Sequence, residues 1–283
     1  MTPTYVLIIL IIYFGILFWI SRLSTKKADS STFFIANRDA PWPLVAYGMI
    51  GVAISGITFI SVPGQVAETQ FSYFQMVLGI SLGLLIVAYV LVPIFYRINA
   101  ISIYSFLKLR FGKYTHKTGA IFFLLAQVAT ASFKLYLMAH VLQLMLFDQV
   151  GIPFEITVLV TLLLIWLYTY RGGIKTVILT DTLQTTFLLL AVILSIWSIS
   201  RQMNLSVGEL YTEMRENNIA KIFYWDWHHP QNFFKLILAG ILLTIMTNGL
   251  DQSVMQKHLT CRNMRSSQKN IVSLGIILLG VNI

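Results

Sequence analysis

The sequence has few charged residues and almost no cysteine. Only 11% of its 283 residues are Asp, Glu, Lys or Arg, whereas 57% are hydrophobic. A water-soluble domain has roughly a quarter charged residues, so this composition excludes such a domain and indicates an integral membrane protein. The single cysteine, Cys261, excludes an internal disulfide, and its place in a basic loop indicates a reduced thiol with no special role.

The sequence also lacks the motifs of an enzyme. It contains no metal-binding cluster of His and Cys, no nucleophile paired with a base and no glycine-rich nucleotide loop. The pair His228–His229 falls in a polar loop and is interpreted as incidental. The formal charge of +9 does not indicate a nucleic-acid partner, because the basic residues cluster in short loops between apolar runs. We therefore expect neither an enzyme nor a nucleic-acid-binding protein.

Long apolar runs dominate the chain. Because about 20 apolar residues cross the hydrocarbon core, the sequence predicts an all-α polytopic bundle of seven spans and the start of an eighth. The predicted spans are 4–22, 42–67, 73–96, 119–147, 154–170, 177–200 and 233–255, followed by 271–283. The last run has 13 residues, which is too short to cross. We therefore expect residues 1–283 to form a single transmembrane domain that is truncated at its carboxyl end.

The distribution of basic residues predicts the orientation. Fifteen of the 20 lysines and arginines lie in alternate loops, and three lie in the loops of the other side. The basic loops are 22–41, 97–118, 171–176 and 256–270. The positive-inside rule places these loops in the cytoplasm and the amino terminus outside. The first run has neither a basic segment before it nor a cleavage site after it, so we expect a retained helix in place of a signal peptide.

Two of the predicted spans are interrupted by residues that weaken a helix. Residues 51–58 combine two glycines with Ser55 and Thr58, and residues 247–253 are mostly polar. Carbonyl groups freed by a break cannot face lipid, so a break lines a cavity or binds a ligand. Interrupted helices at corresponding places in two halves indicate the central site of a secondary transporter. Close helix packing is the alternative for residues 51–58.

Glycines in the next span have the simpler interpretation. Gly79 and Gly83 are four residues apart and therefore lie on one face of a helix. Small residues on one face let two membrane helices approach closely. We expect these two glycines to serve packing and not ligand binding.

Two charged residues lie within apolar spans. Asp181 interrupts the sixth span, and an acid in a membrane usually faces a cavity, an ion or a cation. Its alternative roles are an ion ligand, one half of a buried ion pair or a helix cap. Lys134 is near the middle of the fourth span, too far from either end to reach the interface easily. It either pairs with Asp181 or Asp251, or attracts a carboxylate of a substrate.

These stretches resemble the sodium/solute symporter family. The matching segments are Gly172–Gln184, the interfacial turn Phe106–Gly112, Ile54–Gly56 and Asp251–Lys257. The resemblance implies a LeuT-type fold, in which two inverted five-helix repeats follow an extra amino-terminal helix. This chain would contain the extra helix, the first repeat and the start of the second. The implied function is sodium-coupled symport of a small polar organic solute across a cell membrane by alternating access.

The resemblance also implies a binding site. The implied sodium ligands are Gly51, Ile54, Ser55 and Asp181. The implied substrate contacts are Thr58, Lys134, Asp251 and Gln252. The other ligands of the main sodium site would lie on a later helix, after residue 283. Sugar-transporting relatives usually have Asn where this chain has Asp251, so the resemblance does not favour a sugar.

Two other functions remain open. A proton-coupled carrier would use Asp181 or Asp251 as its titrating group, and a membrane sensor would reuse the fold with a signalling domain after residue 283. In each case the expected partners are the lipid bilayer and a small solute. The identity of the solute, the sodium stoichiometry and the oligomeric state stay open.

Overall fold

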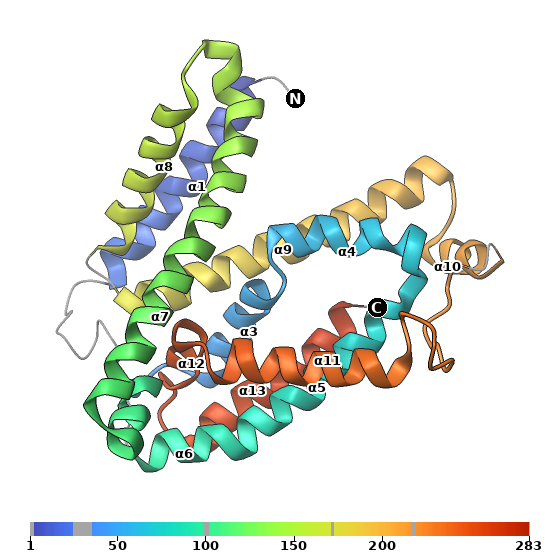
Figure 1. Cartoon of the computed structure of the whole chain (residues 1–283). Helices are drawn as coiled ribbons and strands as arrows, with labels where there is room; N and C mark the ends of the chain where they lie inside the picture. The colour runs from blue at the N-terminus through green and yellow to red at the C-terminus, as the bar shows by residue number, and fades with distance from the viewer. Residues whose placement is uncertain (1–2, 25–35, 99–101, 171–172, 217–218, 283) are drawn as a thin grey trace. The chain divides into compact units, whose positions relative to one another are not determined.

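The computed structural model describes residues 3–24, 36–98, 102–170, 173–216 and 219–282. The described residues form helices and no strand, which confirms the predicted all-α class. They belong to two compact units, one made of Met1–Ala36 with Ala100–Val177 and the other of Asn37–Asn99 with Ile178–Ile283. Each unit is described by itself below (Figure 1).

The first unit contains three apolar helices. They are α1 (Pro3–Ser24), α7 (Ile103–Leu142) and α8 (Phe154–Thr169). Helix α8 packs against both α1 and α7 (Figure 1). The Ser21 hydroxyl on α1 donates a hydrogen bond of 2.6 Å to the carbonyl of Tyr168 on α8. Gly112 has a φ of +88° within α7, so the helix is interrupted where the interfacial turn was expected.

The second unit contains the remaining helices, and α9 enters it at Ile178. In chain order they are α3 (Trp42–Ala53), α4 (Gly56–Thr69), α5 (Tyr73–Ile86), α6 (Val92–Arg97), α9 (Gly173–Met203), α10 (Val207–Glu216), α11 (Phe233–Thr244), α12 (Gln252–His258) and α13 (Met264–Val281). Short π-helical segments, η3 (Val87–Leu91) and η6 (Ile245–Gly249), connect α5 to α6 and extend α11. The core forms where α5 packs against α11 and α13, and α13 packs against α3.

Glycines allow the close approach of α5 and α11. A Cβ added at Gly79 would clash with the backbone of Ile237 on α11, and one added at Gly83 would lie 2.7 Å from the Cβ of Thr244. Gly240 on α11 is equally close to the backbone of α5. The packing role predicted for Gly79 and Gly83 is therefore confirmed.

Each predicted span overlaps one helix or several successive helices. Helix α7 begins at Ile103, before the predicted start at 119, and α13 begins at Met264, before the predicted start at 271. In the part of the chain that the structure describes, four helical stretches are long and apolar enough to cross a membrane alone. They are Thr4–Leu23, Thr58–Arg97, Ile103–Val150 and Gly173–Met203. A fifth crossing results if Phe233–Gly249 and Gln252–His258, which meet at 76°, form one bent span. Helices α3 and α8 are apolar but shorter.

Candidate functional site

The first interrupted helix breaks between α3 and α4. Ile54 has φ −102° and ψ 87°, and Ser55 is extended, so the helical path stops for two residues. The Ser55 hydroxyl accepts a hydrogen bond of 3.3 Å from the backbone N–H of Thr58 and lies 3.1 Å from the Thr58 hydroxyl. Ser55 is therefore the N-cap of α4 and joins Thr58 directly. The break is at the place that the sequence predicts.

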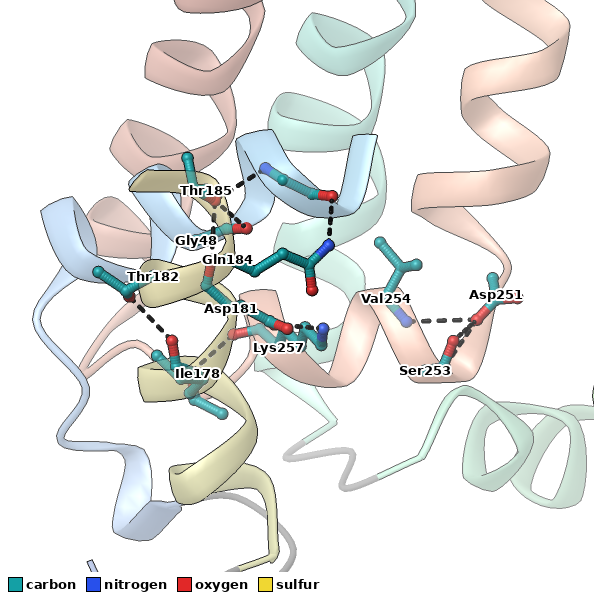
Figure 2. Close-up of polar contacts among 12 residues, drawn as sticks. Gly48, Ile178, Asp181, Thr182, Gln184, Thr185, Asp251, Ser253, Val254 and Lys257 are labelled. Carbon is teal, nitrogen blue, oxygen red and sulfur yellow. Dashed lines mark hydrogen bonds and ion pairs between the residues drawn. The ribbon is translucent and has the colours of Figure 1, made fainter. Parts of the chain in front are cut away.

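The second interrupted helix breaks between η6 and α12. Asp251 is extended there, and its Oδ1 accepts hydrogen bonds from the backbone N–H of Ser253 at 2.7 Å and of Val254 at 3.2 Å (Figure 2). A carboxylate at the N-cap satisfies donors that the first turn leaves unpaired. Asp and Asn are both good N-caps, so the cap gives a structural reason for an acid at this position. The next residue, Gln252, has its side-chain amide 3.4 Å from Gln256 Oε1.

One polar face of α9 holds the last turn of α3. Asp181, Gln184 and Thr185 have the spacing i, i+3, i+4, which places them on the same side of the helix. The backbone N–H of Gly51 donates to Thr185 Oγ1 at 3.0 Å, and Gln184 Nε2 donates to the Gly51 carbonyl at 3.3 Å (Figure 2). The Thr185 hydroxyl also lies 3.2 Å from the carbonyl of Gly48. The turn of α3 that precedes the break is thus fixed by side chains of another helix.

This arrangement explains the glycines of α3. A Cβ at Gly51 would lie 2.5 Å from Thr185 Oγ1 and 3.2 Å from the Thr185 Cα, and one at Gly48 would lie 3.2 Å from the Asp181 Cβ. Any larger residue at position 51 therefore displaces the hydrogen-bonded turn. The packing alternative predicted for this region therefore applies to Gly51, and the helix also breaks three residues later. An ion-lining role for the break stays a prediction.

Asp181 also connects α9 to α12. Its Oδ2 is 2.5 Å from Lys257 Nζ, and the side chains of the two residues are 15% and 13% exposed. The predicted alternative of a buried ion pair is therefore the one seen, with Lys257 as the partner (Figure 2). A sodium role for Asp181 stays a prediction. The face of α9 thus contacts the last turn of α3 through Gln184 and Thr185, and α12 through Asp181.

The structure brings most of the predicted site residues into one unit. Seven of them lie at the two breaks or on α9, namely Gly51, Ile54, Ser55, Thr58, Asp181, Asp251 and Gln252. Lys134 is on α7 in the other unit, so its contact with an acid or with a substrate stays a prediction. Gly172 of the family-like segment lies outside the described residues.

Three residues that shape the site were not among the predicted site residues. Gln184 and Thr185 are signalled by their spacing from Asp181 on an otherwise apolar helix, because a polar face there needs partners. Lys257 was counted with a basic cytoplasmic loop, but it is on the last turn of α12. The sequence offers no local signal for its pairing, since 76 residues separate it from Asp181.

A sequence model of the Sodium:solute symporter family matches residues 33–282, which is most of the chain. The chain belongs to this family. It is 25% identical over 254 residues to the sodium-dependent multivitamin transporter of Oryctolagus cuniculus, covering 85% of this chain and 37% of that relative. It is 26% identical over 253 residues to the sodium/sialic acid symporter of Aliivibrio fischeri, covering 88% of this chain and 48% of that relative.

The fold also matches a solved structure. A Na+-coupled sialic acid symporter in a substrate-bound outward-open state superposes with a TM-score of 0.83 at 19% identity, covering 98% of this chain and 58% of that chain. This likeness confirms the predicted LeuT-type fold class. The chain spans less than half the length of the two curated relatives named above.

Proposed function

We propose that this protein is a sodium-coupled symporter of a small polar organic solute, working by alternating access in a cell membrane with its amino terminus outside. The observation that supports this proposal is the pair of helices interrupted at Ile54–Ser55 and at Leu250–Asp251, each in contact with the polar face of α9. Breaks at corresponding places in two halves indicate a central binding site. The two curated relatives named above are a sodium-dependent transporter and a sodium symporter by name.

The proposed sodium ligands are at the first break. A helix end leaves its last carbonyl groups without helical partners, and a hard cation prefers such oxygens. The proposed sodium ligands on this part of the chain are the carbonyls of Gly51 and Ile54 and the hydroxyl of Ser55. The Gly51 carbonyl accepts a long hydrogen bond of 3.3 Å from Gln184, which a bound ion would compete with. We therefore expect the hydrogen bond from Gln184 to the Gly51 carbonyl to weaken when sodium binds.

The proposed solute contacts come from several helices. Thr58 at the start of α4 and Asp251 with Gln252 at the start of α12 would contact the solute from the two breaks. Lys134 on α7 is proposed as a further solute contact on the family resemblance alone. A carboxylate only accepts hydrogen bonds, so Asp251 favours a solute with N–H or O–H donors. An ammonium at Lys134 favours a solute that also carries an anionic group.

Coupling requires that sodium and the solute each bind one conformation better than the other. Sodium at the first break would order Ser55 and Thr58, which are hydrogen-bonded to each other, and so prepare the solute contact at Thr58. The dependence is reciprocal, because the solute then raises the affinity for sodium by the same factor. The membrane potential adds about 2.3 kcal/mol per sodium charge per 100 mV.

The test is uptake of radiolabelled sugars, amino acids and carboxylates by cells that express the protein, with sodium or choline as the external cation. We expect uptake of one class in sodium only. Equal uptake in both buffers would refute sodium coupling, and sodium-independent uptake driven by a pH gradient would identify the proton-coupled alternative. Ser55→Ala should raise the sodium concentration for half-maximal uptake, whereas Thr212→Ala, which removes an exposed hydroxyl on α10, should not.

A further inference from the structure

The ion pair between Asp181 and Lys257 occupies the position that the family resemblance would assign to a sodium ion. Lys257 Nζ donates a direct, charge-assisted hydrogen bond to Asp181 Oδ2. Both side chains are largely buried, at 15% and 13% exposure, so the pair is screened little by solvent. The ammonium carries the same single positive charge as a sodium ion.

The carboxylate of Asp181 needs one positive charge beside it, and the chain itself supplies that charge. Asp181 lies in the apolar stretch Gly173–Met203, where an isolated carboxylate is costly. The charge of Lys257 neutralises it, and removal of either partner leaves the other as an uncompensated charge. The carboxylate therefore needs no external cation while α12 is in its present position.

The polar side chains beside Asp181 on α9 are already engaged elsewhere. The Thr182 hydroxyl donates to a carbonyl of its own helix at 2.9 Å, and Gln184 and Thr185 bind the backbone of α3. A sodium ion takes several oxygen ligands at once, whereas an ammonium needs only acceptors for its N–H groups. The arrangement around Asp181 thus suits the ammonium of a lysine.

Lys257 is held in place by the rest of α12. The helix begins at the Asp251 cap and ends at buried His258, whose Nδ1 lies 2.9 Å from Nδ2 of Asn270 on α13. The cap starts the helix, and the contact of His258 with α13 fixes its far end, next to the lysine. The ion pair consequently reports whether α12 is docked on α9.

We propose that Lys257 supplies the cation at Asp181 in place of a sodium ion, and that this ion pair holds α12, the second arm of the bent helix, against α9. The inference rests on the proposed function, because it assigns sodium to the first break alone and removes Asp181 from the sodium ligands. Lys257 is a positioning residue in this scheme, since it acts on the site through α12.

The test counts the sodium ions bound by the purified protein at saturating radioactive sodium. Lys257→Gln keeps a side chain of similar length without its charge, and we expect it to bind one more sodium per protein than the parent. The double variant Asp181→Asn/Lys257→Gln should return to the parental count. Lys235→Gln is the matched control, because it removes a lysine of the same unit that lies over the ring of Trp227.

Asp181→Asn alone provides an independent measurement if Lys257→Gln does not fold. The proposal expects its sodium count to equal that of the parent, with a lower melting temperature that the double variant partly restores. Loss of one sodium in Asp181→Asn, or no gain in a folded Lys257→Gln, would overturn the proposal. A parent protein that binds no sodium would instead refute the proposed function, while the gain in Lys257→Gln would still test the role of the lysine.

Discussion

The hydroxyl of Thr185 provides a sharp test of how α9 holds the first break. Its side chain is fully buried, and its Oγ1 accepts the hydrogen bond of 3.0 Å from the Gly51 N–H. Thr185→Val keeps the shape of the side chain but leaves that N–H without its partner. A buried donor that loses its partner costs about 1–3 kcal/mol in water-soluble proteins. Side-chain hydrogen bonds in membrane proteins average about 0.6 kcal/mol and reach about 1.7.

We therefore expect Thr185→Val to lower the free energy of unfolding by about 1–2 kcal/mol. If the loss falls on the sodium-bound state, the affinity for sodium decreases about 5- to 30-fold, since 1.4 kcal/mol corresponds to a factor of ten. The assays are denaturant unfolding in detergent and the sodium dependence of uptake. Both readouts are needed, because the first reports the fold and the second reports the turn that carries Gly51.

Thr185→Ser is the matched control, since it keeps the hydroxyl and removes only a methyl group. That methyl costs about 0.8 kcal/mol of stability, so the unfolding assay alone does not separate the two variants. The sodium dependence does, because only Thr185→Val removes the partner of the Gly51 N–H. Equal sodium affinities in Thr185→Val and Thr185→Ser would show that this hydrogen bond does not support the ion site.

Three further predictions concern the packing, the cap and the thiol. Gly240→Ala should destabilise the protein by about 1–3 kcal/mol in denaturant unfolding, because the added Cβ meets the backbone of α5. Gly280→Ala is the control, since its added Cβ meets no atom within 4 Å and should not destabilise the protein. Equal effects of the two substitutions would contradict the packing argument. Asp251→Ala should cost about 0.5–2 kcal/mol through loss of the cap and Asp251→Asn much less, and the same loss in both would exclude capping as the reason. Burial raises the pKa of the Cys261 thiol from 9.0 to about 12, so its contribution to stability is complete below pH 9 and is lost as the pH rises towards 12. A maleimide should therefore label Cys261 rapidly only in denatured protein, and rapid labelling of the native protein at pH 7.5 would contradict its burial.

The helices and their interruptions could be predicted from the sequence because their causes are local. Twenty apolar residues in a row suit a membrane wherever they occur. Glycine, serine and threonine at 51–58 and the polar residues at 247–253 weaken a helix through their own backbone and side-chain preferences. Both breaks are accordingly found where composition predicts them, at Ile54–Ser55 and at Leu250–Asp251.

The sequence by itself thus determined the class of protein, the order of its helices and the position of its irregular backbone. Only the tertiary structure decided which groups meet. Asp181 finds Lys257 across 76 residues because a 76° bend directs α12 away from the axis of α11, and no local pattern encodes that direction. Gly51 finds Gln184 and Thr185 because the glycines of α3 let α9 approach closely, and the contact distance depends on both helices at once.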